Sequence, residues 1–131
     1  MASGIDKHAA HPTGCEVLLE EKPASDAIVK TEGGYGMKIA SHKTIIGADK
    51  SATIHGGLQI NTVSNVILRN LNIHGIWPHS GPDDAIAVRD SHHVWLDHLN
   101  VWDGGDGNLD ITSQSSYVTV SWCKFWYTDN T

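Results

Sequence analysis

The segment GLQINTVSNVILRN (residues 57–70) alternates apolar and polar residues, turns, and alternates again, and AIAVRDSHHVWLDH (residues 85–98) repeats this pattern. Two further segments align with them, GMKIASHKTIIG (residues 36–47) and NLDITSQSSYVTVSW (residues 108–122). Apolar residues at every second position are typical of a strand with one face in a core. Equivalent residues recur every 21 to 28 positions. This period is the length of one solenoid coil, not of a helical heptad.

The alternation also predicts which side chains point inward. In the first strand of each coil they are Met37 and Ile39, Leu58 and Ile60, Ile86 and Val88, and Leu109 and Ile111. In the second strand they are Thr44 and Ile46, Val66 and Leu68, Val94 and Leu96, and Val118 and Val120. A third strand adds Leu71 and Ile73, Leu99 and Val101, and Cys123 and Phe125. We therefore predict an all-β protein, a right-handed parallel β-helix of roughly four to five coils.

The sequence predicts one domain with two parts. Residues 1–35 fit the repeat poorly, and we expect them to form an irregular first coil or cap, whereas residues 36–131 form the regular coils. The Pro- and Gly-rich insertion at residues 75–84 should bulge outward beside a groove. The last coil, which ends at Thr131, would leave apolar residues uncapped. This predicts either self-association through that end or a segment of a longer protein.

Composition narrows the choice of partners. The formal net charge is −6, and the nine Lys and Arg are scattered, which argues against a nucleic acid or an anionic membrane as partner. No apolar run approaches the ~20 residues of a membrane span, and the first residues lack the apolar stretch of a secretory signal. The only two cysteines, Cys15 and Cys123, either form one bridge or remain free thiols.

Several motifs carry a family resemblance from about Lys38 to Thr131. They are SHKTIIG, SNVILRNLNIHGI, DDAIAV, VWLDH, DGNLDIT and YVTVSWCKFW, and together they resemble the pectate lyase family of polysaccharide lyases. The resemblance implies a secreted, extracellular enzyme that cleaves polygalacturonate (pectate), an anionic plant cell-wall polysaccharide, by calcium-dependent β-elimination. It also implies a catalytic arginine in a coil beyond the last one present. Arg69 and Arg89 match no such motif, and a family lysine that holds substrate falls on Asn130.

Carried over residue by residue, the family's calcium ligands fall on Asp84, Asp106 and Asp110. A further family aspartate falls on Pro82, so the site either lacks one ligand or uses the adjacent Asp83 in a shifted geometry. Calcium takes six to eight oxygen ligands, and as a Lewis acid it disperses the charge that develops when a uronate loses a proton.

Each of these aspartates can also be a simple turn residue, because Asp commonly bonds its own backbone in turns. Asp110 is different, since it lies between inward Leu109 and Ile111 and must point outward, next to Ala87 of the preceding coil. Three carboxylates on one face would repel one another without a cation, which favours the metal site.

Other candidate residues have simpler interpretations. Neighbours on a strand point to opposite faces, so Asp97 and His98 are expected to make structural hydrogen bonds and not to form an acid–base pair. The pairs His8 and His11, and His92 and His93, lack the further ligands of a zinc site.

An aromatic row completes the predictions. His74, Trp102 and Trp126 occupy equivalent positions and predict an outward stack. Two alternative functions remain open: a non-catalytic module that binds polysaccharide, and a glycoside hydrolase that uses Asp83 and Asp84.

Overall fold

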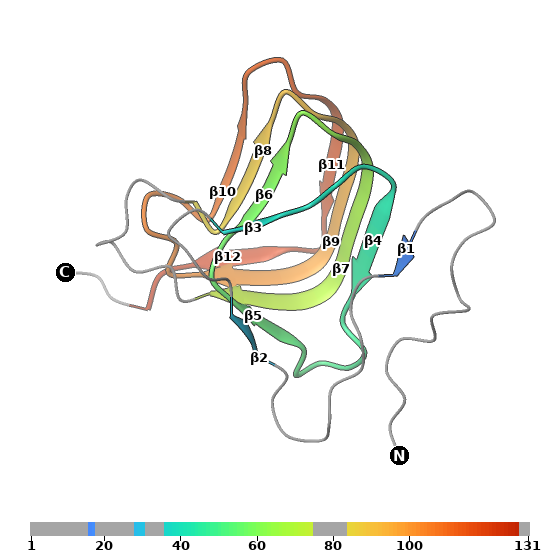
Figure 1. The fold of residues 1–131 in the computed structure, drawn as a ribbon. Helices are drawn as coiled ribbons and strands as arrows, with labels where there is room; N and C mark the ends of the chain where they lie inside the picture. Colours follow the sequence, from blue (N-terminus) through green and yellow to red (C-terminus); the bar gives the residue numbers. More distant parts are fainter. Residues whose placement is uncertain (1–15, 18–27, 31–35, 75–83, 129–131) are drawn as a thin grey trace.

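The computed structural model describes residues 16–17, 28–30, 36–74 and 84–128 (Figure 1). Every regular element in these ranges is a strand. The strands are β1 (Glu16–Val17), β2 (Ile28–Lys30), β3 (Met37–Lys38), β4 (Lys43–Ile46), β5 (Thr53–His55), β6 (Leu58–Asn61), β7 (Ser64–His74), β8 (Ile86–Arg89), β9 (His92–Trp102), β10 (Leu109–Thr112), β11 (Ser116–Ser121) and β12 (Lys124–Trp126).

The strands form two sheets in which every recorded pairing is parallel. One sheet contains β3, β6, β8 and β10 in this order, and the other contains the remaining eight strands. Consecutive members of the four-stranded sheet come from consecutive repeats, so the chain completes about three turns of a solenoid. The predicted parallel β-helix is confirmed, with about three turns where roughly four to five coils were predicted. Strand β1 pairs with β4 and β2 with β5, which adds part of a further rung.

The long strands β7 and β9 each form two sides of the coil. The first half of β7 pairs with β4 and its second half with β5, while β11 and β12 divide β9 in the same way. Figure 1 shows the three sides: the β3–β6–β8–β10 sheet, the β4–β7–β9–β11 side, and the side that runs through β5 and β12.

The corners of the coil are built by residues with positive φ. These residues recur at equivalent positions in successive rungs and form three columns: Thr62, Asp90 and Ser113; His42, Asn65, His93 and Tyr117; and Asn70, His98 and Trp122. A left-handed conformation costs a non-glycine residue about 1–2 kcal/mol, and Asn tolerates it better than most. Each column therefore turns the chain at the same place in successive rungs, which keeps neighbouring strands in register.

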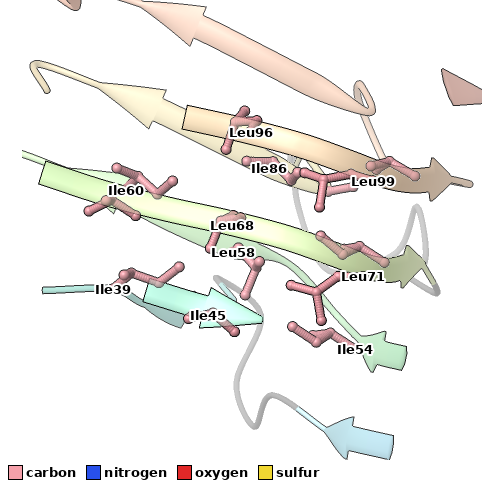
Figure 2. Packing of buried hydrophobic residues seen from close by; sticks show 14 of the residues in the cluster. Ile39, Ile45, Ile54, Leu58, Ile60, Leu68, Leu71, Ile86, Leu96 and Leu99 are labelled. Atoms are coloured by element: carbon pink, nitrogen blue, oxygen red, sulfur yellow. The ribbon is translucent and has the colours of Figure 1, made fainter. Parts of the chain in front are cut away.

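The core is a column of aliphatic side chains between the sheets. Met37, Leu58, Ile86 and Leu109 lie in register as predicted, as do Val66, Val94 and Val118, and Leu68, Leu96 and Val120. In the central rungs these side chains are fully buried, and Figure 2 shows Leu68 and Leu96 following one another along the column. Each buried Leu or Ile contributes about 1.5–3 kcal/mol.

The prediction for the second strand of the first repeat is wrong by one residue. Ile45, not Ile46, pairs with Leu68 and is buried in the core, and Thr44 pairs with Ile67. The reason is the corner: His42 takes the position of Asn65, so this turn has two residues fewer than the next one. A shift of one residue moves every side chain of a strand to the other face.

Three further expectations concern the ends of the chain. The inward residues Ile111, Val120 and Phe125 of the last described rung are exposed. Cys123 is a free thiol, and burial raises its pKa. Cys15 and most of the predicted cap over residues 1–35 lie outside the described residues. In the part of the chain that is described, no helix is long and apolar enough to cross a membrane.

Candidate functional site

The outer face of the four-stranded sheet carries the best-defined acidic residue. Asp110 lies on β10 in register with Ala87 on β8, as predicted, and Ala87 is in turn paired with Gln59 on β6. Its neighbours Leu109 and Ile111 lie in register with the core residues Ile86 and Val88. The period of two therefore points the Asp110 carboxylate away from the core.

The loop between β9 and β10 brings Asp106 to the same end of this sheet. Asp84 directly precedes β8, and the backbone of Ala85 donates a hydrogen bond to the carbonyl of Gly107 over 2.9 Å. A Cβ on Gly107 would stand 2.6 Å from Oδ1 of Asp84. The Asp84 carboxylate thus lies against the loop that carries Asp106, in space that only glycine leaves open.

Two residues that the sequence did not single out hold this loop in place. The side chain of Asn108 accepts a hydrogen bond from Gly104 N and donates one to the carbonyl of Trp126, each over 3.0 Å. Asp103 accepts hydrogen bonds from the backbone N–H and the hydroxyl of Thr128, over 2.8 and 2.6 Å. The available signal was the turn chemistry of DGGDGN, in which Asp and Asn commonly bond nearby backbone.

These contacts decide how well the aspartates fit a metal. The structure brings Asp84 to the Asp106 loop and places Asp110 on the strand that follows, but within the described ranges no three His, Cys, Asp or Glu side chains converge closely enough to hold a metal ion. Asp83 lies outside those ranges. The donor type fits a hard cation, because carboxylate oxygens are the ligands that calcium prefers. The open space at Gly107 is the feature that lets a carboxylate enter this corner.

The predicted aromatic stack is confirmed, and it is longer than predicted. His74 and Trp102 stack at 4.1 Å between ring centres, and Trp102 and Trp126 at 4.8 Å. His55 adds an edge-to-face contact with His74 at 4.0 Å, and Lys124 lies 4.5 Å from the centre of the Trp126 ring. Burial lowers the pKa of His74, and the charge of His55 acts in the same direction against that of Asp103. The stack leads directly into the loop of Asp106.

The prediction that strand geometry separates Asp97 from His98 is wrong. His98 has a φ of 50°, which breaks the alternation at the corner, and its Nδ1 donates to Oδ2 of Asp97 over 2.8 Å. The expected structural hydrogen bonding at this corner is present. Hydrogen bonding from Ser121 lowers the pKa of Asp97, as do His98 and the charge of Arg69, against the effect of burial.

The remaining histidine pairs give no metal site. Nδ1 of His92 and Nδ1 of His93 are 2.7 Å apart, and the His93 ring stacks on Tyr117. Among the residues the structure describes, no third ligand completes this pair. His8 and His11 fall outside those residues.

Comparison with known proteins agrees with this architecture. The family described as pectate lyase matches residues 13–131. The pectate trisaccharide-lyase of Thermotoga maritima is 40% identical over 106 residues, which cover 76% of this chain and 29% of the relative. The probable pectate lyase A of Neosartorya fischeri is 39% identical over 95 residues (66% and 29%), and the probable pectate lyase B of Aspergillus flavus is 41% identical over 97 residues (69% and 29%). This chain spans less than a third of the length of these relatives. With the family matched over nearly all of its residues, the chain belongs to the pectate lyase family.

Proposed function

We propose that this protein acts in the calcium-dependent cleavage of polygalacturonate by β-elimination. The observation that carries the proposal is the outward Asp110 on β10, at the same sheet end where Asp84 meets the loop of Asp106. The names of the relatives, pectate lyase and pectate trisaccharide-lyase, support this substrate class. The substrate is a plant cell-wall polymer too large to enter a cell, so we also propose that the protein acts outside the cell.

In this proposal Asp84, Asp106 and Asp110, with Asp83, supply carboxylate oxygens to Ca²⁺. When bound, calcium would supply a Lewis acid that lowers the energy of the carbanion next to a uronate carboxylate. Asn108 and Asp103 fix the loop of Asp106, and Gly107 keeps space for Asp84. The positive ion would also reconcile a chain of net charge −6 with an acidic polymer.

No residue of this chain is assigned to proton abstraction. Arg69 lies on β7, in the sheet that does not contain Asp110, and its Nε donates to Oδ2 of Asp97 over 3.0 Å. Arg89 ends β8, in register with Asn61 and Thr112. The proposal therefore gives the described residues the roles of metal and substrate binding.

Calorimetric titration with Ca²⁺ tests the metal site. We expect saturable binding by the wild type and at least about tenfold weaker binding by Asp110→Asn, because one anionic ligand is lost. Asp90→Asn is the matched control, since Asp90 lies at a different corner, where its Oδ1 accepts a hydrogen bond from Gln114 N. Identical titrations of wild type and Asp110→Asn would refute the assignment.

Incubation with polygalacturonate tests the reaction class. β-Elimination gives unsaturated products that absorb in the ultraviolet, and a chelator should abolish them. New reducing ends without unsaturation would instead indicate hydrolysis. Binding of the polymer with no product of either kind would favour a non-catalytic module.

A further inference from the structure

A buried carboxylate on the sheet that does not contain Asp110 organises four other side chains on the outer face of β7, β9 and β11. Asp97 is 2% exposed, and its Oδ2 accepts hydrogen bonds from Arg69 Nε over 3.0 Å and from His98 Nδ1 over 2.8 Å. Its Oδ1 accepts the hydroxyl proton of Ser121 over 2.7 Å. The Ser121 oxygen accepts in turn from the indole N–H of Trp95 over 3.0 Å. One carboxylate therefore sets the orientation of all four neighbours.

The direction of these hydrogen bonds fixes what the neighbours present to solvent. An ionised carboxylate only accepts, so Nδ1 of His98 carries a proton and Nε2 is the ring nitrogen left for another partner. Within the described residues, neither this Nε2 nor the terminal amino groups of Arg69 have a recorded partner. The side chains of Arg69 and His98 are 50% and 54% exposed. The network thus holds a guanidinium and an imidazole in fixed positions at the surface.

An aromatic ring completes this arrangement. Trp95 lies on β9 between β7 and β11, and it is 40% exposed although a strand flanks it on each side. The guanidinium carbon of Arg69 is 5.8 Å from the centre of the indole. The residues paired with Arg69 and Trp95 on the outer positions, other than Asp97, are uncharged: Ile46, Ile67 and Thr119. The patch therefore presents a guanidinium and an indole to solvent, while the carboxylate that pairs with the guanidinium is buried.

Stability alone does not account for the network. Removing the Asp97 carboxylate from water has a desolvation cost, and this cost can exceed the energy gained from a buried ion pair. Apolar side chains of similar volume in place of such a pair often give an equally stable protein. A buried carboxylate that restrains Arg, His and Trp side chains at the surface is, however, the arrangement expected of a preorganised binding site, because less side-chain freedom is lost when a ligand binds.

We propose that Arg69, Trp95 and His98 form a second, non-catalytic site for an acidic sugar residue. An indole face packs on the C–H face of a sugar ring, a guanidinium pairs with a carboxylate, and Nε2 of His98 forms a hydrogen bond with a sugar hydroxyl. The proposal rests on the proposed function for the identity of the polymer. It differs from that function in needing no metal, and it lies on another sheet from Asp110.

Binding measured without calcium separates the two sites. We would titrate a galacturonate oligomer into the wild type in excess chelator by calorimetry, and repeat this with the fully methyl-esterified oligomer. The wild type should bind the acid form and should bind the uncharged ester at least about tenfold more weakly. Trp95→Ala and Arg69→Gln should each weaken binding of the acid form by about tenfold or more.

Control variants keep this test independent of folding and of the lyase proposal. Tyr117→Ala removes another exposed ring, and Asp90→Asn removes a carboxylate at a different corner; both should bind in chelator like the wild type. Trp95→Phe retains a ring but loses the hydrogen bond to Ser121, so it should bind with intermediate affinity. Circular dichroism of each variant would confirm that the strands are retained.

The outcomes distinguish the two proposals. Lack of binding in chelator, or equal binding by the wild type and Trp95→Ala, would overturn the second site, even if calcium-dependent cleavage were found. Binding in chelator that requires Trp95 and Arg69 would support it, even if the calcium titration failed.

Discussion

The side-chain amide of Asn70 donates a hydrogen bond to the carbonyl oxygen of Gly47, 2.9 Å away in the preceding coil. Asn70 has a φ of 57° at the bend of β7, and His98 and Trp122 occupy the same position in the next two rungs. The corner thus combines a left-handed backbone with a link between coils. Its contribution to stability can be separated into these two terms.

Replacement of Asn70 tests this separation. Asn70→Ala removes the hydrogen bond to Gly47, which contributes about 1 kcal/mol to stability. It also places alanine in a left-handed conformation, which costs about 1–2 kcal/mol. Asn70→Gly loses the bond but keeps the conformation, so Ala should be less stable than Gly by about 1 kcal/mol. Urea unfolding of both variants measures the difference. Equal stabilities would show that the left-handed backbone carries no cost here.

Leu96 should be among the positions where truncation costs most. Its side chain is fully buried at the centre of β9, with Leu68 before it and Val120 after it in the column. Leu96→Ala should lower the free energy of unfolding by about 2–5 kcal/mol, because a cavity remains in a close-packed core. Val120→Ala, in the same column but 39% exposed, should cost less than half as much. A similar loss for both would contradict the burial gradient along the solenoid.

Gly107 should be sensitive to a single added methyl group. A Cβ there would meet the Asp84 carboxylate at 2.6 Å, so Gly107→Ala must displace either Asp84 or the loop. We expect calcium affinity to fall at least about tenfold, because either displacement moves one carboxylate ligand away from the others. Gly105→Ala in the same loop is the control. Unchanged affinity in Gly107→Ala would separate Asp84 from the metal site.

The aromatic stack should make stability depend on pH. The folded state lowers the pKa of His74 below its ordinary value of about 6.5, so the unfolded state binds more protons in this range. Stability should therefore fall as the pH is lowered from about 7.5 through the ordinary histidine pKa. His74→Phe keeps a ring in the stack and removes the titration. On acidification, the free energy of unfolding should fall more for the wild type than for His74→Phe. An equal fall in both proteins would refute this prediction.

Produced as these 131 residues alone, the chain should self-associate through the exposed inward residues of its last rung. Phe125 is 39% exposed although its equivalent Val101 is fully buried. Phe125→Asp should shift the protein toward monomer in light scattering, because a charge is unfavourable in an apolar contact. Thr119→Asp on the outer side of β11 is the matched control. A wild type that is monomeric at all concentrations would contradict this prediction.

The amino-acid sequence was sufficient for the repeat and for most of the core. A period of two within strands, repeated every 21 to 28 residues, assigns Leu58, Ile86 and Leu109 to one column without knowledge of any contact. It also places Asp110 outward over Ala87, since the alternation leaves no other orientation for that residue. The pattern is local, and parallel stacking is the arrangement that buries every such face at once.

Tertiary structure decided what depends on the corners. A single positive φ at His98 turns its ring toward Asp97, and a shorter turn at His42 moves Ile45 into the core in place of Ile46. The contacts of Asp84 with the Gly107 loop, and the convergence of Arg69, Trp95 and Ser121 around Asp97, join residues from different coils. Hydrophobic alternation records which face of a strand is buried, but it carries no information about how the backbone turns between strands or which polar side chains then meet.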